Sequence, residues 1–239
     1  MADTSVIEIG ELSGRLQVGD RELIAIVGGG GKTTTLYELG RQLKGRTVLT
    51  TTTKMGADRT EGVSVVIDPP DAELASALGD HGTVLAWKAM GPKRADGFEA
   101  ERCNHWFASG IADNIVIEAD GSKRRPFKAP LDYEPVIPTQ ATLVLACIGM
   151  AAIGAPIEKG CFRAETVATL LGASTSDVLT AEMAAQVLLA DNGSKKSVPA
   201  DARFVVLAHQ VGAENRAAFD ALVTAIDGRA QAVGVSALT

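Results

Sequence analysis

Residues 28–34 combine glycine, lysine and threonine in a spacing that could hold a phosphate group. They read GGGGKTT and follow an apolar run, Leu23–Val27. Glycine has no Cβ, so a glycine-rich backbone can turn tightly and approach an anion closely. In such a loop the lysine lies along the β- and γ-phosphates of a nucleotide, and the next hydroxyl binds Mg²⁺. The pattern predicts a phosphate-binding loop with a catalytic lysine and a metal-binding threonine, formed by Gly28, Gly29, Gly30, Gly31, Lys32, Thr33 and Thr34.

The spacing of this loop differs from that of a standard P-loop, in which a glycine would stand at Ile26. The shorter pattern Gly28-x-x-Gly31-Lys32-Thr33 resembles the loop of Mur-type ligases, but the chain shows no extra domain for an amino-acid substrate. A dinucleotide-binding fingerprint would need its third glycine at Thr33. The remaining alternative is a plain glycine-rich turn with an exposed lysine.

Two carboxylates stand at the end of another apolar run. Ile115–Ile117 is followed by Glu118 and Asp120. Alternate residues of a strand face the same side, so these two carboxylates can share one metal ion. Beside a phosphate-binding loop, an acidic strand end holds Mg²⁺ or orients the attacking water. We therefore predict that Glu118 and Asp120 are catalytic and that they bind Mg²⁺ together with Thr33.

A basic run follows the carboxylates at Lys123, Arg124, Arg125 and Lys128. Its position next to an acidic strand end favours anion binding, either to the γ-phosphate or to an acidic second substrate. Lys123 and Arg125 are the ligand-binding residues that this interpretation names. The alternative is a solvated surface loop.

Four consecutive threonines, Thr50 to Thr53, close the strand predicted at residues 47–51. Their hydroxyls could bind Mg²⁺ or phosphate, since ligands collect at the carboxyl ends of parallel strands. Thr51 and Thr52 are the residues that this interpretation places in the site. The alternative is a β-rich strand whose threonines face solvent.

Apolar runs and helical periodicity alternate along the chain, which is typical of an α/β fold with a mainly parallel sheet. We expect one P-loop NTPase-like domain over residues 1–239, built as three layers in which helices flank a sheet. A small subdomain within about residues 55–110 stays an alternative. Strands are predicted at residues 23–27, 47–51, 63–67, 83–87, 115–117, 142–148, 203–208 and 230–235. Helices are predicted at residues 34–43, 71–78, 99–109, 163–171, 181–189 and 213–226, a polar turn at 91–97, a loop at 151–160 and an exposed polar loop at 191–200.

Composition narrows the class of protein. The chain has 239 residues and a net charge of −6, which argues against a nucleic-acid-binding surface. Its most apolar window, residues 141–157, is interrupted by glycine and proline, so no membrane span is expected. The first ten residues lack the features of a signal peptide. Three scattered cysteines suit a reducing compartment, so we expect a cytoplasmic protein.

Several short motifs occur in order between residue 23 and about residue 207. They are GGGGKTT at 28–34, TTTTKM at 50–55, EADGS at 118–122 followed by RPFKAP, EPVIP at 134–138, and then Gly154 and Arg163. In this order they resemble the YqeC family, whose members are called selenium-dependent molybdenum hydroxylase accessory proteins. The resemblance implies a P-loop-type nucleotide-binding fold and a supporting role in the maturation of molybdenum-cofactor hydroxylases. It supports site roles for Lys32, Thr33, Glu118, Asp120 and Glu134.

The chain departs from the family pattern at three positions. Tyr133 and Phe162 stand where the family tends to have histidine, and an acidic residue is expected near Met150. Histidine chemistry is therefore not implied for this chain.

The stretch after the strand at 203–208 bears on the choice of base. Guanine-specific GTPases have Asn-Lys-x-Asp at the end of such a strand, whereas this chain has His209, Gln210, Val211 and Gly212. ATP and GTP therefore both stay open as ligands. A base contact from His209 or Gln210 is open as well.

Two functional hypotheses follow. The first is an Mg²⁺-dependent nucleotide-binding protein, either an NTPase or an enzyme of phosphoryl or nucleotidyl transfer, in which positioning and charge stabilisation carry the reaction. The second is a non-catalytic, chaperone-like module that holds a phosphate-bearing cofactor. The partners implied are a nucleotide and either a molybdopterin-type cofactor or a hydroxylase apo-protein.

Overall fold

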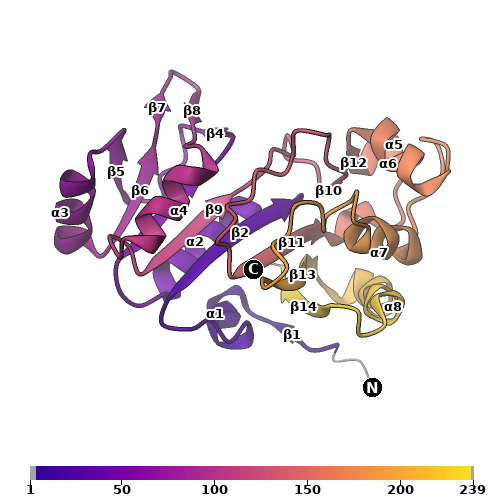
Figure 1. Cartoon of the computed structure of the whole chain (residues 1–239). Helices are drawn as coiled ribbons and strands as arrows, with labels where there is room; N and C mark the ends of the chain where they lie inside the picture. Colours follow the sequence, from indigo (N-terminus) through magenta and orange to yellow (C-terminus); the bar gives the residue numbers. More distant parts are fainter. Residues whose placement is uncertain (1–3, 238–239) are drawn as a thin grey trace.

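A nine-stranded sheet, parallel throughout, forms the centre of the molecule (Figure 1). The computed structural model describes residues 4–237, so the first three and last two residues of the predicted domain lie outside it. The strand order is β1-β14-β13-β11-β2-β9-β3-β6-β5. In chain order these strands are β1 (Val6–Ile7), β2 (Glu22–Gly28), β3 (Thr47–Thr51), β5 (Ser64–Ile67), β6 (Thr83–Trp87), β9 (Asn114–Glu118), β11 (Leu143–Gly149), β13 (Arg203–Val211) and β14 (Gln231–Ser236).

Strand β2 shows why the sheet lies inside the protein. All seven of its residues are buried. Leu23, Ala25 and Val27 join the apolar cluster on one face of the sheet, while Ile24 and Ile26 join the cluster on the other. A parallel strand covered on both faces needs an almost continuous apolar sequence, and β2 has one.

Helices cover both faces, which gives the three layers that the sequence predicts (Figure 1). Apolar residues of α1 (Leu12–Arg15) and α2 (Lys32–Gln42) pack into the cluster on one face. The cluster on the other face contains residues of six helices, α3 (Asp71–His81), α4 (Ala100–Ala108), α5 (Ile157–Gly160), α6 (Ala164–Leu171), α7 (Ala181–Leu189) and α8 (Arg216–Ile226). The α/β prediction is confirmed, and each strand and helix predicted from the sequence is found within a few residues of its expected bounds.

Two small sheets were not predicted. Three strands form an antiparallel sheet in the order β4-β8-β7, namely β4 (Lys54–Gly56), β7 (Ala89–Met90) and β8 (Arg94–Asp96). The predicted turn at 91–97 is therefore wrong in part, because β8 lies within it. The second small sheet pairs β10 (Phe127–Lys128) with β12 (Cys161–Phe162).

Two predicted loops also have more structure than expected. Residues 151–160 include a short helix, α5 (Ile157–Gly160). The 191–200 loop is not simply exposed, since Ser194 is only 4% exposed and Lys196 Nζ donates to the carbonyls of Leu131 and Asp132 at 2.8 and 2.7 Å. These contacts tie the loop to the segment that follows β10.

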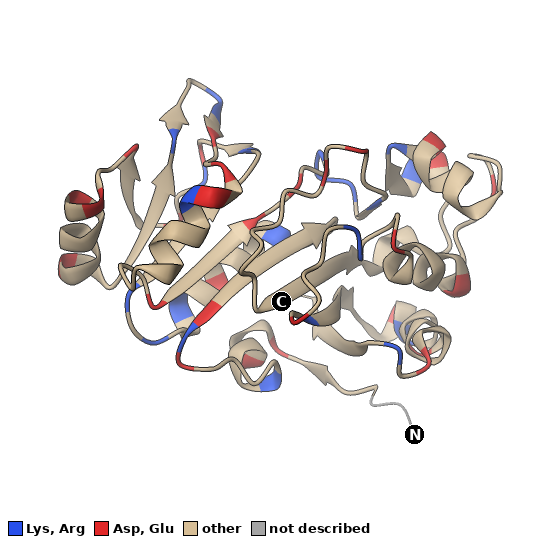
Figure 2. Ribbon diagram, viewed as in Figure 1, with Lys and Arg blue, Asp and Glu red and all other residues tan. Residues whose placement is uncertain are grey.

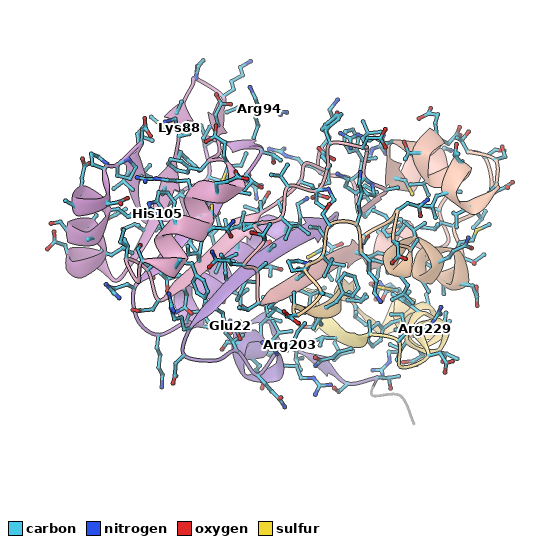
Figure 3. The ribbon with its side chains drawn as sticks, in the orientation of Figure 1. Glu22, Lys88, Arg94, His105, Arg203 and Arg229 are labelled. Atoms are coloured by element: carbon cyan, nitrogen blue, oxygen red, sulfur yellow. The ribbon has the colours of Figure 1, made fainter. Side chains whose placement is uncertain are left out.

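Because neighbouring strands are parallel, the segments that follow β2, β3, β9, β11 and β13 all leave the same edge of the sheet. Both small sheets rise above this carboxyl edge in Figure 1. In open parallel sheets ligands bind at this edge. The opposite edge has a structural ion pair: Arg203 Nη2 lies 2.9 Å from a carboxylate oxygen of Glu22, and the two residues are labelled side by side in Figure 3.

Two further features bear on the expectations from composition. Among residues 4–237, no helix has the length and apolar character needed to cross a membrane. The three cysteines are free and buried.

Candidate functional site

The glycine loop after β2 leads directly into helix α2. Gly31 caps this helix with a φ of 131°, and Gly28 and Gly30 also have positive φ values, a conformation that favours glycine. Within residues 4–237, the backbone amides of Gly30 to Thr34 donate no hydrogen bond to another residue. Unpaired amides at a helix start, with the helix dipole behind them, make a favourable site for an anion.

Close packing also explains why the loop is all glycine. A Cβ on Gly28 would lie 2.3 Å from the Cys147 carbonyl oxygen, and one on Gly30 would lie 2.4 Å from the Gly149 nitrogen. A Cβ on Gly29 would lie 2.6 Å from the Arg125 carbonyl oxygen. The loop is therefore held between the end of β11 and the segment that precedes β10, where no larger residue fits.

Lys32 is buried at the first position of α2. Its Nζ donates to the Gly28 carbonyl at 2.7 Å and lies 3.3 Å from Asp120 Oδ1. Burial by itself would lower the pKa of Lys32, but the carboxylates of Asp120 and Glu118 more than compensate, so the pKa lies above its ordinary value. Lys32 is therefore a fixed positive charge at neutral pH.

Asp120 is the centre of a buried charge network. Its Oδ2 accepts a hydrogen bond from the Gly28 amide at 3.1 Å and lies 3.1 Å from Lys128 Nζ. Its Oδ1 is buried and accepts no hydrogen bond of good geometry from residues 4–237, although the Lys32 ammonium is near. One carboxylate thus holds the glycine loop and faces two lysines.

The network continues away from the loop. Lys128 Nζ lies 2.6 Å from Glu134, and Arg163 makes contacts of 2.5 and 3.2 Å to the two oxygens of the same carboxylate. Burial by itself would raise the pKa of Glu134, but Arg163 and Lys128 lower it below its ordinary value. The sequence placed Lys128 in a basic run expected to bind an anion, and it gave Arg163 no role in the site. Lys128 stands in the motif RPFKAP and Arg163 is itself one of the family positions quoted above, so both could have been indicated.

Glu118 and Thr33 meet, as a shared metal site requires. The Thr33 hydroxyl donates to Glu118 Oε1 at 2.5 Å, and Glu118 is 8% exposed. Residues 4–237 contain no group of three or more His, Cys, Asp or Glu side chains able to hold a metal ion by themselves. Mg²⁺ in nucleotide sites takes one or two carboxylates and completes its shell with phosphate oxygens and water, so this residue set fits it.

The two predicted threonines lie at this edge but use their hydroxyls within the protein. Thr51 donates to the Glu118 carbonyl at 2.8 Å and Thr52 to the Val136 carbonyl at 2.7 Å. Thr51 thus fixes the end of β9, and Thr52 fixes the later segment at Val136. Their role toward a ligand stays a prediction.

The basic run divides into two parts. Lys128 is 1% exposed and belongs to the buried network, whereas Lys123, Arg124 and Arg125 are exposed. The Arg125 guanidinium donates to the Lys159 carbonyl. Among these residues, only Lys128 makes an ion pair with Asp120.

His209, considered above as a base contact, is instead packed under the start of α2. It is 4% exposed, and its Nε2 lies 2.9 Å from the Thr35 hydroxyl. Its ring lies so close to Gly31 that a Cβ there would come within 2.3 Å of it. The exposed neighbour Gln210 remains available for contact with a ligand.

Burial of His209 predicts a pH dependence of stability. Burial lowers the pKa of His209 from 6.5 to about 4, so the unfolded chain takes up a proton that the folded protein excludes. The stability from neutral His209 is fully present above pH 6.5 and is lost as the pH falls through 4. Between pH 7 and 5 we expect the free energy of unfolding to fall by about 2 kcal/mol, measured by urea denaturation.

The control is His209→Gln, which has no titrating ring and should lose most of this slope. Four carboxylates have a lowered pKa, namely Asp71, Asp113, Glu134 and Glu182. Their ordinary values are 3.8 to 4.5, so they act below this window. An equal slope in wild type and variant would contradict the prediction.

Comparison with known proteins identifies the family of this chain. A model of the family described as YqeC protein matches residues 24–165, from the glycine-loop strand through Arg163. The chain is also 34% identical over 191 residues to the Escherichia coli (strain K12) protein named "Uncharacterized protein YqeC", which covers 77% of this chain and 73% of that protein. More than half of the chain is thus matched by the family model, and the chain belongs to the YqeC family.

Proposed function

We propose that this protein binds a nucleoside triphosphate with Mg²⁺ and hydrolyses it or transfers part of it to a second substrate. The observation that carries the proposal is the contact between Thr33 and Glu118 at the start of α2, beside the unpaired amides of the glycine loop. This arrangement joins an anion site to a metal site. Parallel strands β2 and β9 lie next to each other and fix the spacing.

Each residue has a definite part in the proposal. The amides of residues 30–34 and Lys32 would bind the phosphates, and Thr33 and Glu118 would hold the metal ion. Mg²⁺, when bound, neutralises phosphate charge. To reach a phosphate, Lys32 has to exchange its contacts with Gly28 and Asp120 for contacts with the ligand. Asp120 keeps Lys128 as a partner after that exchange.

The setting of the reaction comes from the family. Members of the family are called accessory proteins of selenium-dependent molybdenum hydroxylases, so we place the reaction in the maturation of such enzymes. A molybdopterin-type cofactor or the apo-protein would then be the partner. The thermal unfolding experiment below compares ATP with GTP as the nucleotide.

The second candidate is a module that binds a phosphate-bearing cofactor without turnover. The observation that favours it is the engagement of Lys32 with Asp120 and the Gly28 carbonyl. A lysine held in this way is suited to binding an anion only after a rearrangement. Turnover of the nucleotide separates the two candidates.

Thermal unfolding with and without nucleotide tests the proposal. A ligand at a hundred times its Kd adds about 2.7 kcal/mol to stability, which raises the midpoint of a chain of this size by roughly 5 to 10 °C. We expect this shift with Mg²⁺ and either ATP or GTP, and a smaller one when EDTA replaces Mg²⁺. Thr33→Val should weaken binding at least about tenfold, because it removes a metal ligand, and so remove about half of the shift.

The matched control is Thr224→Val. Thr224 lies on α8, and its hydroxyl donates to the Asp220 carbonyl. Its shift should equal that of the wild type. The proposal would be overturned if neither nucleotide raised the midpoint of unfolding, or if the rise did not depend on Mg²⁺.

A further inference from the structure

Two aromatic rings and two cations lie together at the Arg163 end of the buried network. The Arg163 guanidinium carbon is 4.8 Å from the centre of the Phe162 ring and 5.7 Å from that of Tyr133. Lys123 Nζ is 5.3 Å from the Phe162 ring. These distances are within the range of cation–π attraction. We name Tyr133, Phe162, Arg163 and Lys123 the ring–cation surface.

Arg163 is held in place while Tyr133 stays open. Both oxygens of Glu134 contact the guanidinium, and the Arg163 side chain is 16% exposed. The Tyr133 ring is 69% exposed, the largest value among the exposed large hydrophobic side chains of the described residues. An aromatic ring fixed beside a guanidinium and open to water provides a platform on which another flat ring can stack.

The chain around this surface is basic although the protein as a whole carries a net charge of −6. Arg124 and Arg125 are exposed next to Lys123, and the Arg125 guanidinium donates to the Lys159 carbonyl on α5. Figure 2 shows this basic loop beside the end of α5. The exposed carboxylates Asp132 and Glu158 also lie in these segments, so the excess of positive charge is moderate.

The same loop touches the glycines. The Arg125 carbonyl lies against Gly29, and the Pro126 carbonyl accepts a hydrogen bond from the Gly149 amide at 2.8 Å beside Gly30. A ligand on the ring–cation surface would therefore lie at the carboxyl edge of the sheet, on the loop that borders the phosphate-binding glycines.

We propose that the ring–cation surface binds a small molecule with a flat heteroaromatic ring and a phosphate group, the second substrate of the reaction proposed above. The ring stacks on Tyr133, and the phosphate pairs with the exposed cations of residues 123–125. The role of this molecule as second substrate rests on the proposed function. Its binding to the ring–cation surface does not require a nucleotide. A protein partner is disfavoured, because stable protein interfaces bury about 800 Å² per partner around an apolar centre. The exposed large hydrophobic side chains Val65, Ile67, Met90 and Val178 lie outside the segments that form this surface.

Flavin mononucleotide, a flat heteroaromatic ring with one phosphate, serves as the probe. Titration of its fluorescence with the protein should show saturable quenching, and riboflavin, which lacks the phosphate, should bind at least about tenfold more weakly. Tyr133→Ala should weaken binding between roughly 5-fold and 100-fold, because stacking on one ring is lost. Tyr133→Phe, which keeps the ring, should bind as the wild type does. Arg124→Glu should also weaken binding.

Two control variants and one control ligand, poly-glutamate, separate this proposal from others. Lys88→Glu, which changes an exposed lysine beside the β4-β8-β7 sheet, should leave flavin binding unchanged (Figure 3). Lys32→Ala should bind the flavin as the wild type does, so a failure of the nucleotide proposal would leave this result intact. Equal binding by wild type and Tyr133→Ala, or binding of poly-glutamate with no binding of the flavin, would overturn the proposal.

Discussion

Lys32→Ala is expected to remove nucleotide turnover almost completely and to remove most nucleotide binding. In the proposed function Lys32 is the cation that the first turn of α2 presents to the phosphates, and it is 5% exposed. Charge stabilisation by one preorganised donor is worth roughly 10²- to 10³-fold in kcat. The loss should therefore be of at least this size.

The structure also predicts that the Lys32→Ala protein stays folded. Removal of the ammonium leaves Asp120 with the Gly28 amide at 3.1 Å and Lys128 Nζ at 3.1 Å. The buried carboxylate therefore keeps a charged partner and a hydrogen bond. A loss of activity can then be assigned to the ligand rather than to unfolding.

The measurement is release of inorganic phosphate under single-turnover conditions with Mg²⁺ and the nucleotide that stabilises the wild type. Circular dichroism confirms folding. Lys54→Ala is the matched control, since Lys54 is an exposed lysine that pairs with Asp96 at 3.0 Å near the end of β3. Turnover by Lys32→Ala at the wild-type rate would refute the role of this lysine. Binding without turnover in the wild type would favour the non-catalytic module.

Asp120→Ala is expected to destabilise the fold by about 3–5 kcal/mol, the usual cost of leaving a buried charge without its partner. Asp120 is 3% exposed and faces two ammonium groups, those of Lys32 and Lys128, which are 5% and 1% exposed. The substitution also leaves the Gly28 amide without its acceptor. Total stability of a domain is only 5–15 kcal/mol, so this is a large fraction.

Urea denaturation at pH 7 measures the effect. Asp96→Ala, which breaks an ion pair at the surface, should cost less than about 1 kcal/mol. Lys128 keeps its ion pair with Glu134 at 2.6 Å, so Lys32 is the ammonium that loses its ion-pair partner. In the double variant Asp120→Ala with Lys32→Met this unpaired charge is absent, so we expect part of the loss in stability to be recovered. If Asp120→Ala lowered the free energy of unfolding by no more than Asp96→Ala does, the buried network would not stabilise the fold. If Asp120→Ala does not fold, the milder Asp120→Asn and the double variant provide the comparison.

Local sequence determined most of the secondary structure. Strand β3 at Thr47–Thr51, strand β6 at Thr83–Trp87 and helix α7 at Ala181–Leu189 have the bounds that apolar runs and helical periodicity predict. Such patterns act over a few residues, and burial on both faces of the sheet reinforces them. The turn expected at 91–97 is wrong in part, because β8 is stabilised by pairing with β4, about forty residues earlier in the chain.

The sequence by itself also located the glycine loop, Lys32, Thr33 and the acidic strand end, because each of these belongs to a short contiguous motif. It could not show that Thr33 and Glu118, 85 positions apart, would meet at 2.5 Å. That contact depends on β9 lying beside β2, and strand order is a property of the whole sheet.

Tertiary structure alone decided which charges are buried. Lys123, Arg124, Arg125 and Lys128 look alike in the sequence, yet only Lys128 turns inward, because pairing of β10 with β12 places it between Asp120 and Glu134. Arg163 joins the same network from 29 positions away, and His209 packs against Gly31 from the far end of β13. A buried charge is stable only where opposite charges and hydrogen bonds surround it, and folding brings these together from distant parts of the chain.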